Sequence, residues 1–179
     1  MTTSKNSAYK DALTDAMTYL GKQKNIFFIG QQIIHAGNPM STTLGEVNKD
    51  LMIELPVMEE TQMGMSLGLA ITGKTVVTFY PRWDFLISAT NQLVNHLDKY
   101  TLMTGHKVNI LIRLGKGSDY PLDPGFQHKG NYFNEFKLLC SNIKFHNLER
   151  SEDILNTYID AFSQGGIHVL VEYPQLYYA

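Results

Sequence analysis

Residues 54–73 read ELPVMEETQMGMSLGLAITG, and this stretch predicts the end of a strand, a turn and a helix. Pro56 ends the short apolar strand expected at residues 51–53, because proline restricts the backbone before it to extended conformations. Glu59 and Glu60 then fall in the first turn of the helix, where the helix dipole favours carboxylates. The rest of this helix is apolar on nearly every side, which is typical of a helix buried on several sides.

The glycines and acids of this helix have both plain and functional interpretations. Gly64 and Gly68 are four residues apart on one face, so another backbone can approach closely there. A carboxylate in the first helical turn is a common start signal and often has no further role. The spacing alone therefore leaves Glu59 open to two interpretations: a helix-start acid, or a carboxyl held inside the protein for chemistry.

Helices and strands alternate along the rest of the chain. Apolar residues at helical spacing predict a first helix ending at Gly21, and Asp84 and Ser151 are expected to cap two later helices. Short β-branched or apolar runs predict strands at residues 25–30, 75–80, 107–114, 143–147 and 167–172. Further helices are expected from Asp84 to about Thr104, over residues 133–139 and from Ser151 to the glycines at 165 and 166. The order predicts an α/β fold with helices on both sides of a mostly parallel central sheet.

Composition and charge limit the class of protein. The chain has 179 residues, 44% of them hydrophobic and 18% charged, which suits one domain with a substantial core. A net charge of -2 gives no basic footprint for nucleic acid or an anionic membrane. Cys140 is the single cysteine, so no disulfide forms within the chain, and we expect it to be buried. With no signal-peptide core and no apolar run long enough to span a bilayer, we expect a cytoplasmic protein.

Two stretches rich in turn residues are expected to be loops. Residues 31–49 contain several Gly, Pro, Ser and Thr and predict a loop with one short helical piece. Residues 115–131 read GKGSDYPLDPGFQHKGN, and a loop of this length inside a compact domain is usually functional or disordered. His35 and His128 lie in these two loops, where a histidine is often simply exposed to solvent.

Residues 54–73, with the stretch TVVTFYPRWDFLISATNQLVNHLDKY that ends at Tyr100, resemble the pyrimidine-binding domain of thiamine-diphosphate-dependent enzymes. The similarity is to the transketolase and 2-oxo acid dehydrogenase first-component beta-subunit type. The family pattern is a strand, Pro, a hydrophobic residue, a variable residue, Glu and a helix with glycines. This chain has Pro56, Val57, Met58 and Glu59 in the same register. The resemblance implies the three-layer α/β fold of that domain.

The resemblance also implies roles for individual side chains. Glu59 would be the carboxyl that shares a proton with a pyrimidine ring nitrogen of thiamine diphosphate, which is acid–base work by a buried group. His128 lies in a Phe-Gln-His run that is similar to the family's Gln-His-Ser motif, whose histidine faces the reacting end of the cofactor. Lys129 stands in place of that serine, so the local hydrogen bonding differs. Phe85 would pack on the aminopyrimidine ring, although core packing explains it equally well.

The remaining cofactor-binding residues implied by the resemblance are Tyr80, Pro81 and Gln31. Relatives of the dehydrogenase type tend to carry acids directly after the glycine of the first strand, whereas this chain has Gln31 and Gln32. The change leaves a polar contact and removes a proton carrier. The sequence contains no metal-ligand cluster, so we expect no metal-binding residue in this chain.

Half of the usual site is missing from the sequence. Relatives hold the diphosphate and its magnesium with a Gly-Asp-Gly motif, which does not occur here. We therefore expect residues 1–179 to be a single pyrimidine-binding domain, without a diphosphate-binding domain or a C-terminal transketolase domain. The expected partner is a subunit with Gly-Asp-Gly that binds magnesium, in an α2β2 assembly. The expected activity is ketol transfer or acyloin-type carboligation on a carbonyl substrate; the alternatives are a 2-oxo acid dehydrogenase or decarboxylase beta subunit and a non-catalytic assembly module.

Overall fold

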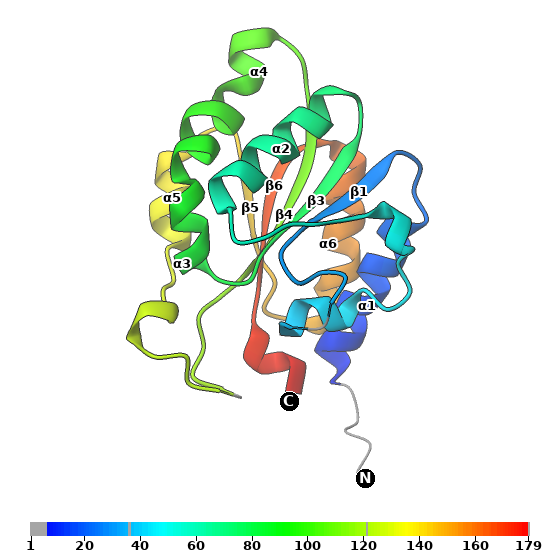
Figure 1. Cartoon of the computed structure of the whole chain (residues 1–179), viewed down its shortest axis with the longest axis vertical. Helices are drawn as coiled ribbons and strands as arrows, with labels where there is room; N and C mark the ends of the chain where they lie inside the picture. The colour runs from blue at the N-terminus through cyan, green and yellow to red at the C-terminus, as the bar shows by residue number, and fades with distance from the viewer. Residues whose placement is uncertain (1–6, 36, 121, 179) are drawn as a thin grey trace.

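Six parallel strands form one sheet in the computed structural model, in the order β2-β1-β3-β4-β6-β5 (Figure 1). The structure describes residues 7–35, 37–120 and 122–178. The strands are β1 (Ile26–Gly30), β2 (Met52–Glu54), β3 (Thr75–Tyr80), β4 (Asn109–Gly115), β5 (Lys144–Asn147) and β6 (Gly166–Glu172). Every neighbouring pair is parallel, so the predicted α/β fold with a parallel central sheet is confirmed.

Helices cover both faces of the sheet and complete the three layers. Helices α1 (Ala8–Gly21) and α6 (Ser151–Gln164) pack together on one face, and the other α-helices lie on the opposite face (Figure 1). These are α2 (Glu59–Ile71), α3 (Trp83–Leu86), α4 (Asp98–Thr104) and α5 (Phe133–Leu139). A hydrophobic core lies on each face of the sheet, and β4 contributes residues to both. Ile110 and Ile112 point to the α2 side, while Leu111 points to the α1 side. This is the alternation expected from the sequence.

The helical stretch after β3 is less regular than the single helix that the sequence predicts. An α-helical turn, a 3-10 turn (Ile87–Ala89), a π-helical stretch (Gln92–Leu97) and α4 follow one another. These changes of pitch rotate the buried face, so Ala89 and Leu93 are buried as expected while Thr101 is exposed and Phe85 is only half-buried.

Two predicted helix caps are wrong. Asp84 and Ser151 lie inside their helices, and the capping positions are taken by Arg82 and Arg150, which make no side-chain cap hydrogen bond. The Asp84 carboxylate instead accepts a hydrogen bond from the backbone N–H of Gly130, at 3.2 Å. An acid that sequence patterns assign to its own helix thus holds a loop 46 residues away.

Helix α2 is buried on one side only, which corrects the expectation of burial on several sides. Gln62, Met63, Ser66 and Ala70 face the sheet, and this buried stripe includes two polar residues. The outward face carries Met65 and Ile71, both exposed, and a Cβ added at Gly68 would meet nothing within 4 Å. Among the residues that the structure describes, therefore, no backbone uses the close approach that Gly68 allows.

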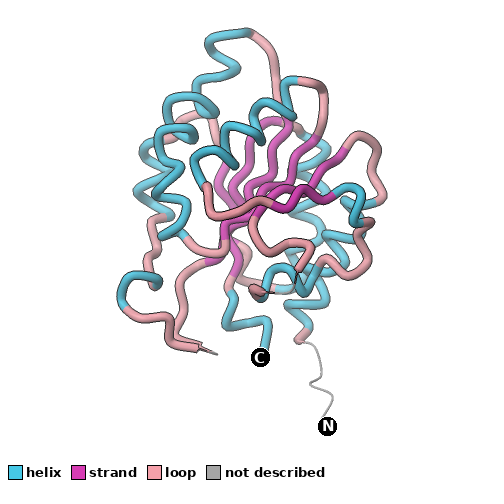
Figure 2. The backbone as a smooth tube through the Cα atoms, in the orientation of Figure 1, coloured by secondary structure: helices cyan, strands magenta, loops and turns pink. Residues whose placement is uncertain are grey.

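The carboxyl ends of the parallel strands meet at one edge of the sheet, where the longest loops gather (Figure 2). The loop after β1, the turn after β3 and the loop of residues 115–131 after β4 all leave from this edge. Ligand sites of open parallel sheets form at such edges. None of the helices in the described ranges is both long enough and apolar enough to span a bilayer.

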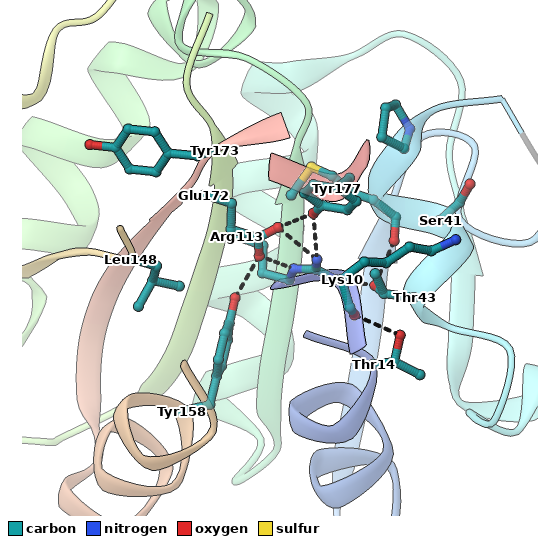
Figure 3. Close-up of polar contacts among 12 residues, drawn as sticks. Lys10, Thr14, Ser41, Thr43, Arg113, Leu148, Tyr158, Glu172, Tyr173 and Tyr177 are labelled. Carbon is teal, nitrogen blue, oxygen red and sulfur yellow. Dashed lines mark hydrogen bonds and ion pairs between the residues drawn. The ribbon is translucent and has the colours of Figure 1, made fainter. Parts of the chain in front are cut away.

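A fully buried ion pair lies behind this edge (Figure 3). Arg113 on β4 makes a two-pronged contact with Glu172 on β6, one prong of which is 2.8 Å long. Tyr158 from α6 and Tyr177 from the C-terminal turn donate to the same carboxylate, and the guanidinium donates to Thr43 at 3.0 Å. Burial lowers the pKa of Arg113, but the charge and hydrogen bond of Glu172 act together with Tyr158 and Tyr177 to raise that pKa above its ordinary value. The cluster thus joins β4, β6, α6, the turn that carries Thr43 and the C-terminal turn around one charge pair, on the face of the sheet covered by α1 and α6.

We expect Glu172→Gln to lower the free energy of unfolding by about 3–5 kcal/mol, because it leaves the Arg113 charge buried without a counter-charge. Urea unfolding followed by circular dichroism measures the change. Arg150→Gln is the control, since the Arg150–Asp153 pair is exposed and its loss should change stability little. A loss below about 1 kcal/mol for Glu172→Gln would contradict a stabilising role for the pair.

Two histidines form a stacked pair between β5 and β6. The rings of His146 and His168 lie 14° from parallel, with their Nε2 and Nδ1 atoms 2.9 Å apart. His168 Nε2 lies 3.0 Å from the carbonyl oxygen of Gly165, so a neutral pair can pass hydrogen bonds from one ring to the next. Burial, helped by His168 and Lys144, lowers the pKa of His146 to about 4. The folded chain therefore holds this pair neutral.

Stability should fall as the pH is lowered from about 6.5 to about 4. His146 takes up a proton near its ordinary pKa of 6.5 when unfolded but only near 4 when folded, so protons favour the unfolded chain in this window. Urea unfolding at a series of pH values should show a shallower decline for His146→Gln than for the unchanged chain. His106→Gln, at an exposed position, serves as the control and should retain the full decline. Equal slopes for all three proteins would refute the assignment.

Candidate active site

The carboxylate of Glu59 is held at the start of α2 beside the loop that follows β1. Gln31 Nε2 donates to Glu59 Oε1 at 3.0 Å. The second oxygen, Oε2, has no hydrogen-bond partner among the residues that the structure describes, and the side chain is only partly buried. Glu60, its neighbour in the first turn, is exposed. The structure thus separates the two acids, and the one with the buried neighbours is Glu59.

Two side chains attach the start of α2 to the end of β3. The Tyr80 hydroxyl donates to the backbone oxygen of Glu59 at 3.0 Å, and burial raises the pKa of Tyr80 far above its ordinary value, so the phenol remains a donor. Gln62 is fully buried and donates from Nε2 to the Thr78 hydroxyl at 3.0 Å and to the Phe79 carbonyl at 2.8 Å. These contacts make the position of Glu59 depend on the central strand.

Glu54, at the end of β2, orders the loop that carries Gln31. Its carboxylate accepts hydrogen bonds from three successive backbone N–H groups, those of Gln32, Ile33 and Ile34, the last two at 2.9 and 2.8 Å. Gln32 has a φ of 54°, in the left-handed region that few residues other than glycine adopt. The sequence reasoning missed this role, although an acid at a strand end opposite a Gly-Gln-Gln turn was a usable signal.

A cavity of about 500 Å³ opens beside these residues, between the loop after β1, the turn after β3 and the loop after β4. Three of the predicted cofactor-binding residues line it, Gln31, Pro81 and Phe85. Glu59, Tyr80 and His128 do not line it and stand behind its wall, where Glu59 contacts Gln31. The fold therefore brings all six predicted residues to one edge of the sheet, with half of them on the cavity surface.

His128 lies against Phe85, with ring centroids 5.4 Å apart and planes at 50°. Its Nδ1 atom is buried and has no hydrogen-bond partner in the described part of the chain. The loop is held in place by the Asp84–Gly130 hydrogen bond and by a close approach at Gly117, where an added Cβ would lie 2.4 Å from Lys129 backbone atoms. An unpaired ring nitrogen next to an aromatic face is a group available to a ligand.

Lys129, the residue that departs from the family motif, ties its own loop together. Its ammonium contacts the carboxylate of Asp119 and that of Asp123, the latter at 2.8 Å. The backbone of Gly125 also donates to Asp123, at 2.8 Å. Lys129, at the position of the motif's serine, thus cross-links the loop through Asp119 and Asp123 and places no hydroxyl beside His128.

His35 is exposed, in agreement with its interpretation as a surface residue. Cys140 is buried, as expected, and burial raises the pKa of its thiol to about 12, so it is not a reactive thiolate at neutral pH. In the described ranges, no group of three or more His, Cys, Asp or Glu side chains is placed to hold a metal ion.

Comparisons with known proteins place this arrangement in context. A pyruvate dehydrogenase E1 component subunit beta from Cyanidium caldarium is 28% identical over 99 residues, which cover 51% of this chain and 29% of that protein. The same subunit from Chaetosphaeridium globosum is 30% identical over 111 residues, 59% of this chain and 33% of that protein. The mitochondrial subunit from Dictyostelium discoideum is 25% identical over 129 residues, 69% of this chain and 36% of that protein. No family model matches the chain.

A solved structure described as a split gene transketolase, inactive beta4 tetramer, has the same fold. It superposes with a TM-score of 0.71 over 93% of this chain and 51% of that one, at 15% identity. The predicted resemblance to the pyrimidine-binding domain of this enzyme group is confirmed. The chain spans about a third of the length of the curated relatives that it matches.

The side chains predicted to bind the cofactor are chemically complementary to an aminopyrimidine. Glu59 offers a carboxylate oxygen without a partner, Phe85 offers an aromatic face on the cavity wall, and His128 offers an unpaired nitrogen beside that face. A protonated ring nitrogen, a flat ring and a polar substituent are complementary to these three features. Glu59 and Gln31 are therefore the residues that would hold the ring edge, and Phe85 the residue that would stack on it.

We expect Glu54→Ala to loosen the loop after β1, because three backbone N–H groups lose a charged acceptor. Amide hydrogen exchange should be faster at Ile33 and Ile34 while protection in β3 and β4 is unchanged. Glu46→Ala, an exposed acid in the same loop, is the matched control. Unaltered protection at Ile33 and Ile34 would show that Glu54 does not order this loop.

Proposed function

We propose that this chain is the pyrimidine-binding half of a two-component thiamine-diphosphate-dependent enzyme. Glu59 carries the proposal, because it combines the family register with a carboxylate oriented by Gln31 and an oxygen free for a ligand. Thiamine diphosphate, when bound, supplies a nucleophilic carbon and an electron sink for making or breaking a bond beside a carbonyl. The chain's own residues would orient its ring and manage protons.

Glu59 would hold a proton at Oε2 and share it with a ring nitrogen. Gln31 supports this role, since its N–H occupies Oε1 and leaves only Oε2 for the ring. Phe85 would fix the plane of the ring and exclude water from one side of it. His128 would donate or accept a proton at Nδ1 on the side of the reacting carbonyl.

A partner chain is part of this proposal, because no Gly-Asp-Gly motif occurs in residues 1–179. We propose a diphosphate-binding subunit with a Gly-Asp-Gly motif that holds magnesium, in an α2β2 assembly. Several apolar residues are exposed: Val57 just before α2, Met65 and Ile71 on α2, and Phe126, which is 99% exposed. Surfaces of this kind commonly mark protein interfaces. A solved structure of the same fold, described as a split gene transketolase, inactive beta4 tetramer, supports an enzyme whose parts lie on separate chains.

Two reaction classes follow from two different observations. The structural neighbour is a transketolase, which favours ketol transfer or acyloin-type carboligation. The curated relatives are pyruvate dehydrogenase subunits, which favours decarboxylation of a 2-oxo acid with acyl transfer. The glutamines at 31 and 32, where dehydrogenase-type relatives tend to carry acids, favour ketol transfer or ligation. The non-catalytic assembly module is the remaining alternative.

Affinity capture of this chain from its native host, with thiamine diphosphate and magnesium present, should recover a chain with a Gly-Asp-Gly motif. The reconstituted pair is then assayed with ketose phosphates, and with 2-oxo acids plus an artificial electron acceptor. Turnover of 2-oxo acids alone would reverse the order of the two reaction classes. Capture of this chain alone, together with failure to bind the cofactor, would favour the assembly module.

In the reconstituted pair, Glu59→Gln should slow exchange of the thiazolium C2 proton by about 10²–10⁴-fold, because the amide cannot share a proton with the ring. Proton NMR after quenched exchange in deuterium oxide measures the rate. Glu60→Gln is the matched control, since it removes the adjacent, exposed acid of the same helical turn. Full exchange in the Glu59→Gln protein would rule out the proposed role.

A further inference from the structure

The cavity of the candidate site is cationic, although the chain as a whole carries a net charge of -2. Two basic side chains line it, Arg82 from the turn after β3 and Lys116 from the loop after β4. None of the residues that line it is an aspartate or a glutamate. A concave surface with charge of one sign attracts ligands of the opposite sign.

Neither cation is neutralised by the described part of the protein. The ammonium of Lys116 lies 4.8 Å from the centroid of the Tyr173 ring, and neither it nor Arg82 makes an ion pair with a described carboxylate. Lys129, in the same loop as Lys116, contrasts with them because two carboxylates contact it. The charges at Lys116 and Arg82 are thus left available while a neighbouring lysine is used for structure.

The fold holds both cations in place. Arg82 is half-buried between Pro81 and the fully buried Trp83, so its backbone is tied to the end of β3. Lys116 donates from its backbone N–H to the Glu172 carbonyl at 2.8 Å, and its side chain lies over the Tyr173 ring. Arg82 and Lys116 are both half-buried and line the same cavity. An anion bound between two such cations reduces their mutual repulsion.

We propose that this cavity recognises an anionic group of the carbonyl substrate, a carboxylate or a phosphate, with Arg82 and Lys116 as the specificity-determining residues. The inference rests on the proposed function only in naming the ligand as the substrate, because the diphosphate of the cofactor is assigned to the partner chain. Gln32 and Asn38 also line the cavity and add uncharged polar side chains to it. Phe85 and Leu122 supply apolar surface for the uncharged part of the molecule.

The test is a titration of this chain by itself with inorganic phosphate and, separately, with acetate, at constant ionic strength set by sodium chloride. Backbone amide NMR signals of Arg82 and Lys116 report binding. We expect saturable shifts, and Arg82→Gln and Lys116→Gln should each weaken binding by tenfold or more, roughly the value of a charged hydrogen bond. Stronger binding of phosphate indicates a phosphate ester as substrate, and stronger binding of acetate indicates a carboxylic acid.

Lys137→Gln is the matched control, because the Lys137 ammonium also lies near an aromatic ring, 6.0 Å from the Phe133 centroid, but outside the cavity. It should bind both anions as the unchanged chain does. Absence of saturable shifts with both anions, or equal affinities in all variants, would overturn the inference. This readout needs neither cofactor nor partner, so it fails separately from the Glu59 experiment. If Glu59→Gln slows C2 exchange but the chain binds no anion, only the anion-binding inference is refuted. If the chain binds anions but Glu59→Gln exchanges at the full rate, only the cofactor role of Glu59 is refuted.

Discussion

Parallel strands send all of their carboxyl ends to one edge of the sheet, and every residue of the candidate site depends on that constraint. Gln31 follows β1, Glu59 opens the helix after β2, and Phe85 follows β3. His128 belongs to the loop after β4. Gln31 therefore meets Glu59, 28 positions further along the chain, in a hydrogen bond, and Phe85 meets His128 in a ring contact. An antiparallel arrangement of the same elements would divide them between two edges.

The buried charge pair keeps this edge in register. Arg113 and Glu172 join β4 to β6 just before the chain enters the two segments that form one side of the cavity. Thr43 and Tyr177 connect the pair to the turn beside Met40 and to the C-terminal turn beside Tyr178, and Met40 and Tyr178 line the cavity. The desolvation cost of burying two charges is offset only when such additional hydrogen bonds satisfy them.

The site uses its charged residues in two distinct ways. Glu54, Asp84 and Lys129 have partners inside the protein and set the shapes of the loops. Glu59 keeps one oxygen without a partner, and Arg82 and Lys116 make no ion pair with the described residues. Residues of the second kind are available to a ligand because the first kind already maintain the loops around them. Lys129 belongs to the first kind, since its two ion pairs cross-link its own loop.

The sequence by itself determined the order of helices and strands, the parallel sheet and the register of Glu59, since these follow from hydrophobic periodicity, turn residues and one motif, all of which are local. It also singled out Gln31, Phe85 and His128 as candidate site residues. Only the tertiary structure decided that Asp84 holds Gly130 instead of capping its helix, that Gln62 is buried on the sheet-facing side of α2, and that Arg82 and Lys116 share a cavity. Each of these depends on contacts between segments distant in sequence, and a polar side chain's partner is set by what the fold brings within about 3 Å of it.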